Sequence, residues 1–158
     1  LKCLYTEGMI GAVAGFFSYP KGGFDAPFAP DKPPQHLVQM VVLGRVHALF
    51  SHHEALLRQG DLLPGPNKHA KVPDQPAYEF PSGKPRQRVL ARKMPHEPRW
   101  LLTAWASDGV EGPATVEIPD LGKVTLAARA VGSVYTATLK DGKPVLRQVD
   151  AEGSQVAP

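Results

Sequence analysis

The C-terminal half of the chain alternates apolar and polar residues with a period of two, the pattern of strands that bury one face. Each alternating segment is bounded by turn residues, and Asp141-Gly142 between two of them predicts a tight hairpin, because glycine adopts positive φ without steric cost. The predicted strands are Val89 to Met94, Arg99 to Ala106, Ala114 to Ile118, Lys123 to Ala130, Ser133 to Lys140 and Pro144 to Val149. Short strands at spacings of roughly ten residues predict a mainly β fold, an antiparallel β-sandwich over residues 88–150.

The central segment of this series carries both tryptophans of the chain. Its odd and even positions predict two faces, one with Trp100, Leu102 and Ala104 and the other with Leu101, Thr103 and Trp105. At least one tryptophan is therefore expected in the core. For the other we favour a contact between domains over a binding platform.

Proline is the main departure from average composition. The chain has 17 prolines and 15 glycines in 158 residues, roughly twice the average usage of proline, which disfavours an all-helical bundle. Prolines concentrate in residues 20–34 and 61–87, which we interpret as an irregular loop and a surface connector. The predicted division of the chain is therefore 1–60, 61–87, 88–150 and a flexible tail at 151–158.

Residues 1–60 are predicted to form a strand, a loop and a helix. The glycines among residues 1–19 argue against a free-standing helix there, and the apolar run from Ala12 to Phe17 reads as a buried strand of a parallel sheet. Residues 35–59 predict one long amphipathic helix between Pro33-Pro34 and Gly60. Its expected apolar stripe consists of Leu37, Met40, Val41, Leu43 or Gly44, Ala48, Leu49 and Leu56.

Composition narrows the functional classes. The formal charge of +3 comes from scattered basic residues, so no nucleic-acid partner is predicted. Cys3 is the only cysteine, which excludes an internal disulfide framework and a multi-thiolate metal site. The longest apolar stretch, Gly8 to Phe17, is too short to span a bilayer, so no membrane segment is predicted. Cellular location stays open, extracellular and periplasmic compartments included.

Candidate site residues lie around the predicted N-terminal strand. Ligands of α/β folds bind at the carboxyl ends of parallel strands, which singles out Glu7 as a candidate catalytic carboxylate and Asp25 in the following loop as a substrate-binding residue. Tyr19 and Phe24 flank that loop and have rings that stack on a ring-shaped ligand. The alternative is structural: a solvated Glu7, an Asp25 that caps its own turn, and aromatic rings in the core.

The histidines raise the question of a metal site. His47, His52, His53 and His69 lack the one-turn spacing of helical metal ligands, so a solvated helix end is the interpretation that we favour. No metal ligand set and no cofactor is predicted, because nucleotide-binding glycine motifs and a nucleophile elbow are also missing from the sequence.

The order of these elements resembles the end of a glycoside hydrolase with a (β/α)8 barrel, namely its last βα unit and its C-terminal β-sandwich. The segment GRVHALFSHHEALLRQGDLLPG (residues 44–65) is similar to a final barrel helix. RWLLTAWASDG (99–109) and VEIPDLGKVTLAARAVGSVYTATLKDGKPVLRQVD (116–150) are similar to the all-β tail domain of such enzymes.

The resemblance implies a C-terminal portion of a carbohydrate-active enzyme. The sandwich would then support the barrel, the loop at residues 19–25 would lie near a sugar site, and the remainder of the enzyme would pack on residues 1–19 and the helix at 35–59. Glu7 is the one position onto which a barrel-mouth carboxylate can be carried.

Two alternatives come from other functional classes. One is a stand-alone β-sandwich module for binding or assembly that oligomerises through its apolar N-terminal segment. The other is a small metal-dependent enzyme that uses the histidines.

Overall fold

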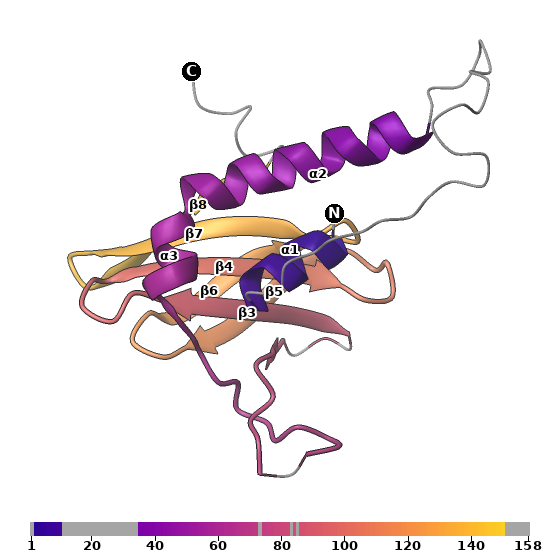
Figure 1. The fold of residues 1–158 in the computed structure, drawn as a ribbon. Coiled ribbons are helices and arrows are strands. Elements are labelled where there is room, and N and C mark those ends of the chain that lie inside the picture. The colour runs from indigo at the N-terminus through magenta and orange to yellow at the C-terminus, as the bar shows by residue number, and fades with distance from the viewer. Residues whose placement is uncertain (1, 11–34, 73, 83, 85, 151–158) are drawn as a thin grey trace.

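The computed structural model describes residues 2–10, 35–72, 74–82, 84 and 86–150. The helices are α1 (Lys2–Ile10), α2 (Gln35–His52) and α3 (Glu54–Gln59). The strands are β1 (Asp61–Leu62), β2 (Phe80–Pro81), β3 (Gln87–Lys93), β4 (Arg99–Ala106), β5 (Gly112–Ile118), β6 (Gly122–Ala128), β7 (Ser133–Lys140) and β8 (Lys143–Gln148) (Figure 1).

The centre of the fold is a six-stranded antiparallel sheet with the order β1-β3-β4-β7-β8, in which β2 also pairs with β3. Strands β5 and β6 form a separate two-stranded hairpin. Every strand predicted from the period-two pattern is present, and the bounds of β4 and β7 agree to the residue. The prediction of a mainly β, antiparallel fold is confirmed. Where a sandwich would have a second large sheet, the described chain has a single two-stranded hairpin.

The turn between β7 and β8 confirms the hairpin prediction. Lys140 pairs with Lys143 across a two-residue turn. Asp141 and Gly142 both have positive φ, 53° and 74°, as expected for the primed turn whose twist matches that of the strands.

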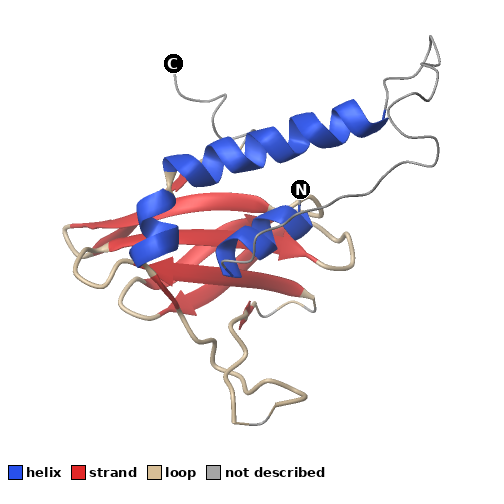
Figure 2. Cartoon of the chain, viewed as in Figure 1, coloured by secondary structure: helices blue, strands red, loops and turns tan. Residues whose placement is uncertain are grey.

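One face of the sheet packs against the β5–β6 hairpin. The cluster between them contains Trp100, Leu102 and Ala104 of β4 together with Val116, Ile118, Val124 and Leu126 of the hairpin. Trp100 is only 1% exposed. The other face is covered by helices (Figure 2), and its cluster combines Leu101, Trp105 and Leu90 with Tyr5, Met9, Val46, Phe50 and Leu56.

Both predicted faces of β4 are therefore confirmed. Trp105 is 6% exposed and belongs to the cluster that joins the sheet to the helices. This agrees with the prediction that the second tryptophan makes a contact between parts of the chain.

Helix α1 corrects the expectation of a non-helical N-terminus. A Cβ atom added at Gly8 would overlap the ring of Phe50 on α2, so the glycine provides the space that this ring occupies. Tyr5 meets the same ring edge-to-face, with centroids 6.3 Å apart. Tertiary packing thus compensates the low helix propensity of glycine. The predicted strand at residues 12–17 lies outside the described residues.

The helix predicted at 35–59 is interrupted at His53, which has φ −111° and ψ 23°. The predicted apolar stripe is also partly wrong: Val41 is 53% exposed and Ala48 is exposed, whereas Val46 and Phe50 are buried. The reason is that α2 is apolar around most of its circumference, so its periodicity does not select one face. Leu56 is buried on α3, as predicted.

Candidate functional site

Of the predicted site residues around the N-terminal segment, the structure describes only the backbone of Glu7, which lies within α1. The strand predicted to follow it, at residues 12–17, lies outside the described residues. Tyr19, Phe24 and Asp25 lie outside the described residues.

The four histidines considered for a metal site lie in three parts of the chain. His47 is exposed on α2, His52 and His53 lie where α2 meets α3, and His69 lies in the connector. In the connector, Nδ1 of His69 accepts hydrogen bonds from the backbone N–H groups of Lys71 and Val72, at 3.2 and 3.1 Å. Within the described ranges, no three His, Cys, Asp or Glu side chains come close enough together to hold a metal ion.

Arg92 on β3 is a buried cation that sequence reasoning missed. It is 8% exposed, and its Nε donates a hydrogen bond to the carbonyl of Met9 at 2.6 Å. Its Nη1 donates to the carbonyls of Leu57 and Gly60, at 3.1 and 2.5 Å. Burial lowers the pKa of Arg92, and the charge of Asp61 opposes that shift.

The three carbonyls that Arg92 binds come from the C-terminal ends of α1 and α3, where helix carbonyls lack helical partners and cations are favoured. One guanidinium therefore attaches two helices to the sheet. The sequence contains no clear signal for it, because Arg88 and Arg92 flank Leu90 at the same spacing of two and only the position of the helix ends distinguishes them.

Asp150, which follows β8, is a second buried charged residue with several hydrogen bonds. Its Oδ2 accepts a hydrogen bond from the backbone N–H of Val134 at 2.8 Å, and both carboxylate oxygens accept from Nε2 of Gln148. Burial, with a further contribution from the charge of Asp150, raises the pKa of Tyr5 to about 12. The negative charge of Asp150, just after β8, therefore acts on Tyr5 of helix α1.

An apolar groove of about 650 Å³ lies between the connector and the β5–β6 hairpin. Its walls are formed by Pro64, Gly65, Pro66, Phe80 and Pro81 on one side and Val116, Ile118 and Pro119 on the other, with Glu117, Asp120 and Gly122 completing the lining. The carboxylate of Asp120 forms an ion pair with Lys93. The ammonium of Lys93 also lies 5.8 Å from the ring centroid of Trp100.

This groove offers apolar contacts and few polar groups. The one groove carboxylate with an ion pair is held by a lysine of the neighbouring sheet, which is a structural role. Its chemistry fits contact with an apolar surface better than acid–base catalysis. Sequence reasoning missed it because one wall belongs to the proline-rich connector, which has no periodic pattern.

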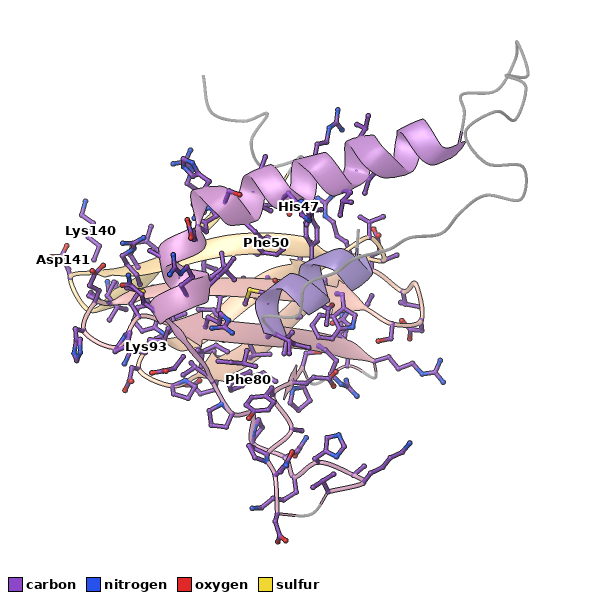
Figure 3. All side chains as sticks on the ribbon, in the orientation of Figure 1. His47, Phe50, Phe80, Lys93, Lys140 and Asp141 are labelled. Atoms are coloured by element: carbon purple, nitrogen blue, oxygen red, sulfur yellow. The ribbon has the colours of Figure 1, made fainter. Side chains whose placement is uncertain are left out.

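Two large apolar side chains are exposed on the helices near the predicted partner contacts. Val41 on α2 is 53% exposed and Ile10 on α1 is 51% exposed. Helix α2 contains Arg45 and three histidines but no acidic residue. Figure 3 shows Phe50 on the side of α2 that faces the sheet. Because Phe50 is buried and Val41 is exposed, the two side chains lie on different sides of the helix.

Comparisons with known proteins add no relative: no family model, no curated protein and no solved structure matches the chain. No helix in the described part of the chain has the length and apolar character needed to cross a membrane.

Proposed function

We propose that this chain is the C-terminal portion of a glycoside hydrolase and that its β unit supports the catalytic barrel without carrying out the reaction itself. The proposal rests on the sequence resemblance over residues 44–65, 99–109 and 116–150. In it, the six-stranded sheet and the β5–β6 hairpin are the two layers of the β-sandwich of the tail domain, and the loop at 19–25 lies near a sugar site.

The observation that carries the proposal is an unequal covering of apolar surface. Both faces of β4 are buried within the chain, so the centre of the sheet needs no further layer. Helix α2, in contrast, buries Val46 and Phe50 beneath it while Val41 stays exposed. Val41 on α2 and Ile10 on the contacting helix α1, both more than half exposed, support a further packing partner, and in this proposal that partner is the barrel.

The carboxylates with known partners support a structural role for the described part. Asp150 binds the backbone of β7, Asp120 pairs with Lys93, and Glu97 pairs with Arg99 at 3.1 Å. We therefore expect the acid and base of hydrolysis to come from residues other than these three.

The test is a charge placed on the outer side of α2. Val41→Asp in the natural polypeptide is expected to lower its melting temperature by about 4 °C or more, because a buried valine contributes about 1.5–3 kcal/mol and a buried unpaired carboxylate costs more. The same change in the chain of residues 1–158 is expected to have almost no effect. Val110→Asp is the matched control, since Val110 is 66% exposed away from the helices.

Activity is the second part of the test. The natural polypeptide is expected to hydrolyse an aryl glycoside from a panel of sugars. The proposal is wrong if a natural polypeptide of residues 1–158 alone is the whole product, or if Val41→Asp has equal effects in both settings.

The exposed side of α2 also supports the second candidate, a stand-alone module that oligomerises through its apolar N-terminal segment together with this helix. Sedimentation of residues 1–158 separates the two. A mass that rises with concentration and returns to 17.1 kDa in Val41→Asp favours the assembly module, whereas a constant monomer favours the barrel partner.

A further inference from the structure

The joint between α2 and α3 is a defined interruption of one helix. Helix α2 ends at His52 and α3 begins at Glu54, and the direction of the chain changes between them (Figure 1). His53 forms the joint through its backbone: its N–H donates to the carbonyl of Phe50 at 3.0 Å, and its carbonyl accepts from the N–H groups of Leu56 and Leu57 at 3.0 and 3.3 Å. Its side chain caps nothing.

The two imidazole rings at this joint are neighbours. His52 and His53 meet edge-to-face with ring centroids 5.3 Å apart. His52 is exposed in the last turn of α2, where the carbonyl ends of a helix favour a cation. His53 is only partly exposed, so a proton on its ring has to be held in a less hydrated position beside the charge of His52.

The charged groups around His53 come from three elements. His52 belongs to α2, Arg99 begins β4, and both charges act on His53. The nearest carboxylate in the chain, Glu54 of α3, is paired with Arg58 at 3.1 Å. Glu97, which precedes β4, is paired with Arg99 at 3.1 Å. The positive charges of His52 and Arg99 therefore act on His53, whereas these two carboxylates form ion pairs with arginines.

We propose that His53 makes the α2–α3 joint an acid-sensitive hinge, which holds α2 against the sheet when the ring is neutral and loosens it when the ring becomes charged. The two sides of the hinge are attached unequally. Helix α3 is fixed by Arg92 through the carbonyl of Leu57, whereas α2 is attached through the buried side chains Val46 and Phe50. Opening at the joint therefore releases α2 and leaves α3 on the sheet.

The direction of the pH effect follows from the environment of the ring. Burial, then the charges of His52 and Arg99, lower the pKa of His53 below its ordinary value. A histidine whose pKa is lowered by folding contributes stability above its unfolded pKa of about 6.5 and loses it as the pH falls toward the folded value. The joint is therefore closed at neutral pH and opens progressively in acid.

The test uses the chain of residues 1–158 and hydrogen exchange of the α2 amides, corrected for the intrinsic effect of pH, from about pH 7.5 to about pH 5. We expect several-fold more opening of residues 41–52 at the acid end, with no matching change in β4. His53→Gln, which cannot gain a charge, is expected to abolish the rise. His47→Gln removes an exposed histidine of the same helix and is expected to keep it.

A second measurement uses no variant, so it remains informative if His53→Gln fails to fold. In the unaltered chain, the nuclear magnetic resonance titration of His53 is expected to lie below the ordinary histidine pKa of about 6.5. A titration of His53 at or above that value overturns the proposal, as does an acid-induced opening that persists unchanged in a folded His53→Gln variant.

Discussion

The two faces of the six-stranded sheet are covered by different means. The hairpin side is closed by strands, and its cluster draws on alternate residues of β3 to β7. The helical side is closed by α1, α2 and α3, which contribute a few large side chains, while Arg92 of β3 binds carbonyls at the ends of α1 and α3. We therefore expect damage on the hairpin side to affect the whole fold, and damage on the helical side to affect mainly the helices.

The largest effect is expected from Leu102→Ala on the hairpin side. Leu102 is fully buried in the cluster beneath the hairpin, so the change removes buried methyl groups and leaves a cavity, at a cost of about 4 kcal/mol in the free energy of unfolding. Urea denaturation followed by circular dichroism measures it. The exposed Val145→Ala on β8 is the control, and a loss below about 1 kcal/mol would contradict the assignment of this face as the main core.

Arg92→Met tests the polar attachment on the other face, with an expected cost of about 3 kcal/mol. The methionine keeps much of the apolar stem but leaves the carbonyls of Met9 and Gly60 without the donors that they have here. Hydrogen exchange is expected to rise in α1 and α3 well before the β5–β6 hairpin. Arg147→Met on exposed β8 serves as the control, and uniform exchange across both faces would remove the contrast between them.

The strands were predictable and the helical layer was only partly so, for a physical reason. In β4 each residue alternates between two covered faces, so Trp100 and Trp105 are placed by sequence position alone. The buried side of α2 depends on where α1 lies, and this position depends on a glycine that contacts a ring 42 residues away, Gly8 against Phe50. The role of Arg92 likewise depends on helix ends that no local pattern specifies.

The candidate site was less predictable than the fold. Glu7 was chosen because it precedes the strand predicted at residues 12–17, which lies outside the described residues, and its own backbone belongs to the helix Lys2–Ile10. Val41 was predicted on the inward stripe, but it is 53% exposed, and the partner surface proposed above starts from that exposure. The apolar character of the helix was therefore informative, whereas its orientation required the tertiary contacts.

Two glycines on neighbouring helices sharpen the comparison within the helical layer. Gly8→Ala is expected to destabilise the chain by about 2 kcal/mol, since overlap with the Phe50 ring outweighs the gain of about 1 kcal/mol in helix propensity. A Cβ atom added at Gly44 on α2 meets no atom within 4 Å. Gly44→Ala is therefore expected to stabilise the chain by the full gain in helix propensity, about 1 kcal/mol. Thermal unfolding measures both, and two changes of the same sign would show that α1 does not pack on Phe50 in solution.

The smallest effect is expected at the β7–β8 turn, at the tip of the sheet where Lys140 and Asp141 project (Figure 3). Gly142→Ala forces a side chain onto a residue with φ 74°, which costs about 1 kcal/mol for an L-residue. Gly44→Ala serves again as the matched control, because it adds the same methyl group at negative φ in a helix. Since β7 is central and β8 is bound only to β7 in the described sheet, hydrogen exchange is expected to increase in β8 and to stay unchanged in β4. An increase that spreads to β4 would mean that the turn stabilises the central sheet, and the hairpin side would then depend on local turn chemistry as much as on its core.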